Sequence, residues 1–214
     1  MSVAPTCDVD RGRPPGNPFS TRHVRPGRIV PLDGRGEPLD LEPLLERLQK
    51  LGGSAAIRGP HGSGKTTLLE HLAAALQDRG IPVVRVRLRT VGDTATVFRA
   101  ILQSQPGGVL CIDSWDCLGR MPAAVVRLLA RVRQCGLIVT THKTTSLPLL
   151  AHRDTTPELL AAIVRRLPGC DREETARIGP QEIDAAFARA QGNLREALYD
   201  LYDRFESFKR LDAS

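Results

Sequence analysis

The sequence predicts an α/β protein in which helices cover both faces of a parallel β-sheet, followed by a small helical domain. Two observations support this prediction. Between residues 54 and 151, short apolar segments alternate with helical patterns, and strands that alternate with helices form parallel sheets through right-handed crossovers. From residue 156 onward the strand pattern ends and helical segments follow one another.

The strands are predicted from short apolar runs. We expect them at 54–57, 83–89, 109–112, 137–140 and 147–151. The strand at 83–89 alternates aliphatic residues with three arginines, namely Arg85, Arg87 and Arg89. Because a central parallel strand is apolar on both faces, this alternation places the strand at an edge of the sheet. The arginines then lie in solvent, and the alternative is a stripe that binds anions.

The helices are predicted from residues that begin and end them. We expect helices at 41–50, 67–77, 95–103, 123–134, 157–167, 180–190 and 193–208. Asp40 and Asp93 precede two of these segments as capping residues, and Gly52 ends the first. Pro157 and Pro180 suit first-turn positions, because a nitrogen there needs no hydrogen-bond partner within the helix.

The most informative motif lies between the first strand and the next helix. It has the form G-x-x-x-x-G-K-[ST] and consists of Gly59, Pro60, His61, Gly62, Ser63, Gly64, Lys65 and Thr66. Its glycines let backbone N–H groups approach phosphate oxygens, and the helix that starts there directs its positive end at the anion. Lys65 can bridge the β- and γ-phosphates, and the hydroxyl of Thr66, supported by Thr67, can ligate Mg²⁺. We therefore expect ATP and Mg²⁺ to bind here.

A second motif supplies an acidic residue to the same site. Asp113 follows an apolar strand about 45 residues after the phosphate loop. We expect it to hold Mg²⁺ through water, opposite Thr66. Ser114 stands directly after it, where many ATPases with these motifs have the glutamate that positions water. Asp116 and Asp93 are the nearby candidates for that role, and an ordinary turn or cap residue is the alternative for each.

Two further segments can contact the γ-phosphate. Thr141 and His142 follow the strand at 137–140, whose carboxyl end opens on the ligand crevice of a parallel sheet. We expect one of them to sense the γ-phosphate, and a capped loop is the alternative. Arg195 lies in the first turn of the last helix, where its guanidinium can clamp the phosphates and distinguish ATP from ADP. The alternative is a solvated arginine, either alone or paired with Asp200 or Glu196.

The composition limits the setting and the partners. The formal net charge of +6 does not by itself predict nucleic-acid binding, which stays an alternative. The five cysteines have no C-x-x-C spacing, so we expect reduced thiols and neither a disulfide framework nor a metal site. No apolar run reaches about 18 residues and no signal-peptide pattern is present. We therefore expect a cytoplasmic protein that neither spans a membrane nor is exported.

Together these motifs resemble those of the AAA+ ATPases and of their relatives, the STAND-type signalling ATPases. Residues 59–66 match the Walker A motif, and 109–113 match the Walker B motif except for its second acidic residue. Residues 137–142 resemble the sensor 1 strand, and 192–198 are similar to the sensor 2 helix, with Arg195 on its arginine. The resemblance implies a P-loop NTPase three-layer sandwich with a parallel sheet, followed by a small helical lid.

The resemblance covers about residues 40–208. It also implies that residues 17–32 act as an N-terminal linker that packs near the adenine. The candidates for an arginine finger are Arg131, Arg133 and Arg153. A ring is not implied, and a nucleotide-dependent oligomer stays open.

We expect the chain to divide into four segments. An N-terminal segment rich in proline, glycine and arginine covers residues 1–38, and its first 16 residues are predicted to be disordered. Residues 39–154 form the P-loop NTPase core, 155–208 form the helical lid, and 209–214 form a tail.

The function that these expectations favour is ATP binding with Mg²⁺-dependent hydrolysis. The chain has no obvious effector domain, so it would act as a nucleotide-dependent switch on a protein partner. Loss of the γ-phosphate would release the contacts of Thr141 and Arg195 and let the lid move. A non-hydrolysing nucleotide-binding interaction module and a small-molecule kinase are the alternatives.

Overall fold

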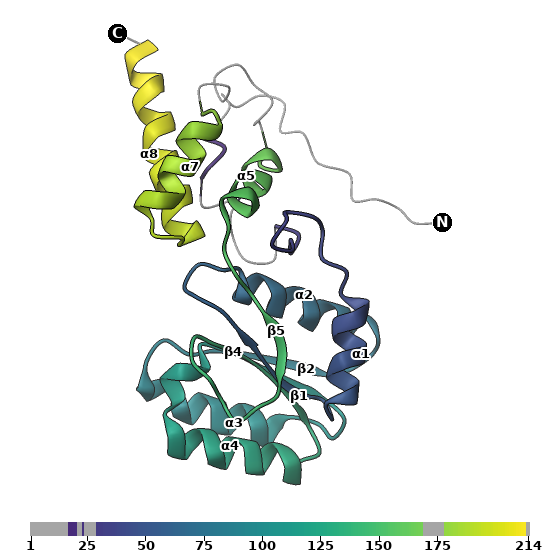
Figure 1. Cartoon of the computed structure of the whole chain (residues 1–214). Coiled ribbons are helices and arrows are strands. Elements are labelled where there is room, and N and C mark those ends of the chain that lie inside the picture. The colour runs from purple at the N-terminus through teal and green to yellow at the C-terminus, as the bar shows by residue number, and fades with distance from the viewer. Residues whose placement is uncertain (1–16, 21–22, 24–28, 169–177, 213–214) are drawn as a thin grey trace, which may run out of the picture.

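The computed structural model describes residues 17–20, 23, 29–168 and 178–212. Figure 1 shows two parts: a larger part that contains the sheet, and a group of helices above it that the chain reaches after the last strand. The prediction of disorder for the first 16 residues lies outside the described residues. The cysteines that the structure describes, Cys111, Cys117 and Cys135, are free thiols, as expected.

The sheet is parallel throughout, which confirms the predicted fold class. Its strands are β1 (Ser54–Arg58), β2 (Val83–Arg87), β3 (Val109–Asp113), β4 (Gly136–Thr141) and β5 (Leu149–His152). Their order across the sheet is β2-β3-β4-β1-β5, so the arginine-rich strand β2 lies at an edge, as its alternating pattern predicts. The phosphate loop follows β1, which is flanked on both sides and therefore gives the loop a rigid base.

The helices lie close to their predicted positions. They are α1 (Glu42–Lys50), α2 (Lys65–Asp78), α3 (Thr94–Gln103), α4 (Arg120–Val132), α5 (Pro157–Arg165), α7 (Pro180–Arg189) and α8 (Leu194–Asp212). Two short 3₁₀ turns, η1 (Val91–Asp93) and η2 (Trp115–Leu118), follow β2 and β3. No helix in the described part of the chain is long and apolar enough to cross a bilayer.

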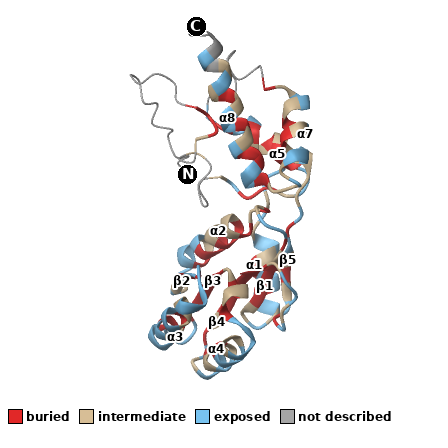
Figure 2. Cartoon of the chain, turned by 90° about the vertical axis from the view of Figure 1, so that its left-hand side faces the viewer, coloured by how far each residue is buried: buried red, intermediate tan, exposed pale blue. Residues whose placement is uncertain are grey.

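Helices cover both faces of the sheet, as the burial colours of Figure 2 show. Because side chains of a strand alternate between faces, neighbouring residues of β1 enter different cores. Ala55 and Ile57 pack with leucines of α1 and α2, whereas Ala56 belongs to the core formed with α3 and α4. Three layers result, with the carboxyl ends of the strands facing the separate group of helices.

The upper helices α5, α7 and α8, here called the lid, have a hydrophobic cluster of their own. The N-terminal segment contributes to it, because Phe19 and Leu32 are buried among lid residues. Phe19 packs edge-on against Phe205 of α8, and the Asn17 amide donates to the carbonyl of Tyr202 at 3.0 Å. The first described residues are thus attached to the lid, so the N-terminal segment and the lid form one packed unit.

Candidate nucleotide-binding site

The phosphate loop connects β1 to α2 and has the conformation that its glycines permit. Gly64 precedes the helix with a φ of 78°, a left-handed conformation that side chains other than glycine rarely adopt. Gly59 lies so close to the chain beyond β5 that a Cβ atom there would overlap the carbonyl oxygen of Arg153. The loop therefore needs glycine for two separate reasons, one conformational and one steric.

Lys65 is buried at the start of α2, with 6% of the residue exposed. Its ammonium donates to the carbonyls of Gly59 at 2.9 Å and Pro60 at 2.6 Å, and it lies 3.3 Å from Nδ1 of His142. Burial lowers the pKa of Lys65 from 10.5 to about 8, although the negative charges of Asp113 and Asp116 oppose this shift. A phosphate anion beside the ammonium would favour its charged form.

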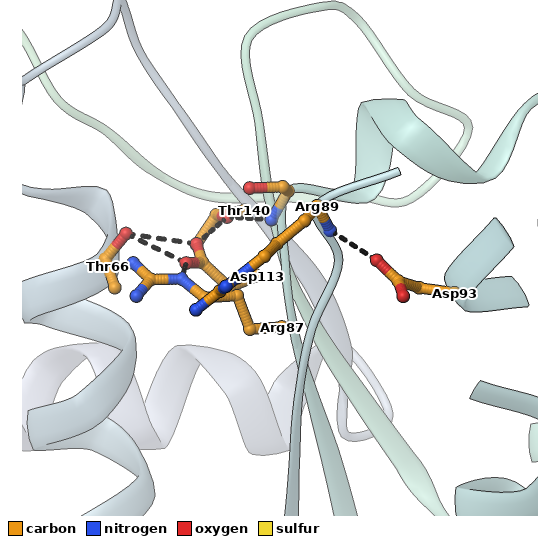
Figure 3. Close-up of polar contacts among 7 residues, drawn as sticks. Thr66, Arg87, Arg89, Asp93, Asp113 and Thr140 are labelled. Carbon is orange, nitrogen blue, oxygen red and sulfur yellow. Dashed lines mark hydrogen bonds and ion pairs between the residues drawn. The ribbon is translucent and has the colours of Figure 1, made fainter. Parts of the chain in front are cut away.

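Asp113 forms the centre of a polar network at the end of β3 (Figure 3). Its carboxylate accepts hydrogen bonds from the hydroxyl of Thr66 at 3.0 Å and from the hydroxyl of Thr140 at 2.6 Å. The guanidinium of Arg87 donates to the other carboxylate oxygen at 2.9 Å. Asp113 is 7% exposed, so this buried charge is balanced by one cation and two hydroxyl donors.

The oxygens of Thr66 and Asp113 fit Mg²⁺, which prefers hard oxygen ligands and commonly takes one carboxylate together with substrate phosphates and water. No group of three histidine, cysteine, aspartate or glutamate residues suited to a metal occurs in the described part of the chain. Thr66 and Asp113 supply two oxygen ligands, an arrangement that suits a metal that arrives with a phosphate ligand.

Arg87 is a site residue that the sequence analysis assigned to solvent. The β2–β3 register pairs Arg87 with Asp113, so the two side chains meet at the same edge of the sheet. The other two arginines of the strand do not reach the carboxylate: Arg85 pairs with Glu70, and the side chain of Arg89 has no ion pair among the described residues. Identifying Arg87 from the sequence as the arginine that contacts Asp113 would have required knowing that β2 and β3 are neighbours.

Asp116 and Thr141, both predicted site residues, contact each other instead of the cavity. The Thr141 hydroxyl donates to Asp116 at 2.8 Å, and the other carboxylate oxygen accepts from the backbone N–H of His142 at 2.7 Å. Side chains alternate along β4, so Thr140 and His142 line the cavity, and Thr141 does not. Asp116 therefore fixes the end of β4, and of the two predicted sensors His142 is the one placed at the cavity.

Asp93 is also engaged away from the cavity. Figure 3 shows its carboxylate turned toward the backbone of Arg89, which donates to it at 2.7 Å, and the N–H of Thr90 donates at 2.9 Å. These backbone donors lower the pKa of Asp93, first through Arg89 and then through Thr90. The sequence leaves two roles open for Asp93, a residue that positions water for hydrolysis and an ordinary turn or cap residue. This geometry favours the turn or cap residue.

His142 stacks on His61 of the phosphate loop, with ring centroids 3.7 Å apart. Burial lowers the pKa of His142, and the charges of Lys65 and His61 lower it further. A neutral imidazole results near pH 7, which can accept a hydrogen bond from the ammonium of Lys65. The stack thereby joins the variable part of the phosphate loop to the end of β4.

A cavity of about 270 Å³ extends from the phosphate loop to the lid. The core supplies the phosphate loop with Thr67, Asp113, Ser114 and the end of β4. The lid and the N-terminal segment supply apolar walls that include Ile29, Val30, Leu32, Leu159, Ile163, Leu194 and Leu198. Arg195 and Arg153 also line the cavity. One end therefore suits phosphates, and the other suits an apolar ring system.

Arg195 faces the cavity from the first turn of α8. Burial is the main cause of the lowered pKa of Lys65, and the positive charge of Arg195 adds to the shift. Asp200, a carboxylate of the same helix, pairs instead with Arg189 and Arg204. Within the described ranges Arg195 takes part in no ion pair; it lines the cavity and is also exposed to solvent.

The three candidates for an arginine finger lie in different places. Arg153 lines the cavity of its own chain. Arg133 donates to the carbonyls of Leu102 and Ser104, beside α3. Arg131 lines a larger hollow of about 880 Å³ near the amino ends of the strands, which contains none of the predicted site residues.

Comparison with solved structures finds the same fold in RuvB from Thermotoga maritima. A point mutant of RuvB superposes with a TM-score of 0.56 at 20% identity, covering 81% of this chain and 62% of the RuvB chain. RuvB described as a Holliday junction branch migration motor superposes with a TM-score of 0.51 at 21% identity, covering 77% of this chain and 58% of that one. This chain thus spans about three fifths of the RuvB chains.

No protein-family model and no curated protein matches the sequence. The fold is nevertheless specific: a parallel sheet in the order β2-β3-β4-β1-β5, a phosphate loop after β1, and a helical lid after β5. RuvB, which shares it, is an AAA+ P-loop ATPase. The chain therefore has the fold of the P-loop ATPases of the AAA+ group.

Proposed function

We propose that the protein binds ATP with Mg²⁺ and hydrolyses it slowly, acting as a nucleotide-dependent switch on a protein partner. The observation that carries the proposal is the convergence of Lys65, Thr66 and Asp113 at one end of a cavity whose other end is closed by the lid. These three groups come from the two motifs, and Arg195 is added from a distant helix.

The residues of the chain have distinct roles in this proposal. Backbone N–H groups of the phosphate loop and the start of α2 hold the phosphates, and Lys65 contacts the β- and γ-phosphates. Thr66 and Asp113 hold Mg²⁺, which neutralises phosphate charge when it is bound. The apolar walls formed by residues 29–32 and by lid leucines accommodate the base.

Slow hydrolysis follows from the lining of the cavity. Among the described residues that line the cavity, Asp113 is the one carboxylate. Its oxygens already accept hydrogen bonds from Thr66, Thr140 and Arg87. Both oxygens of Asp116 are engaged by the end of β4. No second carboxylate in this lining can orient a water molecule, so full activity would depend on a group from a partner. The same observation favours the second candidate, a nucleotide-binding module that does not hydrolyse ATP.

The switch is proposed to act through His142 and Arg195, which line the cavity and would contact the γ-phosphate. Their contacts would be lost with that phosphate, and the lid would be free to shift relative to the core. We keep the division into a core at 39–154 and a lid at 155–208 for this reason. The lid carries the N-terminal segment with it, because Phe19 is buried in the lid cluster.

Steady-state phosphate release from ATP with Mg²⁺ tests the proposal, alongside ATP affinity measured by calorimetry. Lys65→Ala should abolish tight binding and all turnover, whereas Lys143→Ala changes an exposed lysine nearby and should leave both intact. Binding without turnover in the unaltered protein would favour the non-hydrolysing module. Nucleotide affinity that survives in Lys65→Ala would contradict the assigned site. A requirement for a second substrate would indicate a kinase.

A further inference from the structure

Arg153 follows β5 and occupies the junction between core, lid and N-terminal segment. Its backbone N–H donates to the carbonyl of Arg58 at 2.7 Å, which holds it beside the strand that leads into the phosphate loop. The residue is 7% exposed, and its guanidinium lines the nucleotide cavity. One terminal nitrogen donates to the carbonyl of Leu32 in the N-terminal segment.

The hydrogen-bonding capacity of this guanidinium is incompletely used. Its Nε atom is buried and has no hydrogen-bond partner, and within the described residues Arg153 makes no ion pair. Burial lowers the pKa of Arg153, and the negative charges of Asp33 and Asp154 oppose this shift. Arginine cannot relieve such burial by losing its proton, because its pKa remains far above neutrality. A buried cation with an unsatisfied N–H is stabilised by an anion placed beside it.

The surroundings of Arg153 indicate where this anion belongs. The guanidinium lies beside Gly64, whose Cβ position would be 3.9 Å from one of its terminal nitrogens. The N–H groups of this part of a phosphate loop cradle the α- and β-phosphates. Arg153 also donates to the carbonyl of Leu32, which with Leu159 belongs to the apolar lining of the same cavity. Arg153 thus contacts both the phosphate loop and a residue of the apolar wall.

We propose that Arg153 binds the α-phosphate of the nucleotide in the same chain, through the Nε–H group that has no partner among the described residues. This inference rests on the proposed nucleotide site. It differs from an arginine finger supplied to a neighbouring copy, which must be exposed to reach that copy. Because ADP and ATP share the α-phosphate, Arg153 contributes to the affinity for both. Its bond to Leu32 also connects the N-terminal segment to the occupied site.

The test measures ADP, ATP and adenosine binding by calorimetry for the unaltered protein, Arg153→Gln and Arg153→Lys. The expected result for Arg153→Gln is a loss of about tenfold or more for ADP and ATP alike, with adenosine unaffected. Arg153→Lys retains the charge and should recover part of the loss. Arg165→Gln alters an exposed arginine of the lid and serves as the control.

Thermal unfolding separates this role from a merely structural one. Removing a buried, unpaired charge in Arg153→Met should leave the Tm of the nucleotide-free protein nearly unchanged but reduce the rise in Tm that ADP produces. Unchanged ADP affinity in Arg153→Gln, or an equal loss for adenosine, would overturn the inference. So would a lower Tm without nucleotide together with an unaltered ADP effect. If the unaltered protein binds no nucleotide, the proposed function itself fails.

Discussion

The two ends of the nucleotide cavity differ in how their polar groups are satisfied. At the core end, Asp113 accepts hydrogen bonds from Thr66 and Thr140, so the acidic group is held in place by the protein itself. At the lid end, Arg153 and Arg195 line largely apolar walls and make no ion pair among the described residues. The core end is therefore preorganised, whereas at the lid end the anionic ligand that we propose would stabilise the buried charge of Arg153.

This difference suggests a division of labour. The core end contains the residues proposed for phosphate and metal binding, and they lie at or directly after strand ends of the sheet. At the lid end Arg195 lies on the separately packed lid, so its distance from the phosphates depends on where the lid lies, whereas Arg153 directly follows β5 of the core. Variants of the core end should therefore affect turnover, variants of Arg195 should affect the discrimination between nucleotides, and variants of Arg153 should affect the affinity for ADP and ATP alike.

The largest effect is expected for Asp113→Asn. The amide keeps the shape of the carboxylate but removes the negative charge that helps to hold Mg²⁺, so Mg²⁺-dependent phosphate release should fall by about 100-fold. Asp116→Asn, in which the altered group contacts β4 and not the cavity, should have a much smaller effect. Equal losses in the two variants would show that Asp116 takes part in hydrolysis and would weaken the contrast with Asp113.

Arg195→Ala should affect ATP selectively at the lid end. Losing a charge-assisted contact to the γ-phosphate should weaken ATP binding by about tenfold, while ADP affinity stays unchanged. Calorimetric titration of both nucleotides measures the difference, and Arg165→Ala provides a matched loss of positive charge on the lid surface. If ATP and ADP affinities fall equally, Arg195 does not distinguish the two nucleotides.

Sequence patterns predicted the core end better than the lid end for a physical reason. Residues 59–66 are contiguous, so the motif itself specifies their geometry, and Asp113 follows its strand directly. The contact of Arg87 with Asp113 depends on which strands are neighbours, and the position of Arg153 depends on how lid and core pack. These features arise from contacts between distant parts of the chain.

The end of β4 shows how closely two candidates for one role can be placed in the sequence. The pattern of β4 predicted polar groups at its carboxyl end, and the structure places them there. The phase of side-chain alternation nevertheless directs Thr140 and His142 to the cavity and Thr141 to Asp116. Because alternation has a period of two residues, a shift of one position exchanges the residues that face the ligand.

The pH dependence of binding tests the preorganised end through Lys65. Its pKa of about 8 means that the free protein loses the ammonium above that pH, whereas bound phosphates favour the charged form. ATP affinity should therefore fall as the pH rises, by about tenfold between pH 8 and pH 9.5. Affinity that is constant over this range would contradict the shift. Buffers with different ionisation enthalpies should also reveal proton uptake on binding at pH 9.

The lowered pKa of Lys65 also predicts the direction of a stability change. Between pH 8 and pH 10.5 the unfolded chain binds more protons than the folded chain, because the unfolded lysine keeps its ordinary pKa. The folded state should therefore gain stability as the pH rises through this window. Comparing the pH dependence of the free energy of unfolding between the unaltered protein and Lys65→Met measures this contribution. The gain in stability should be absent in Lys65→Met.

The smallest effect is expected for Asp93→Ala, because Asp93 belongs to neither end of the cavity. Asp93 accepts hydrogen bonds from the N–H groups of Arg89 and Thr90, and with Thr90 it forms a capping box before α3. Losing this cap should lower the Tm by about 2–4 °C and leave the rate of ATP hydrolysis unchanged. A large fall in turnover without a loss of Tm would instead indicate that Asp93 acts as the general base. Since its carboxylate faces the backbone of its own turn, that outcome would require the η1 turn to open when nucleotide binds.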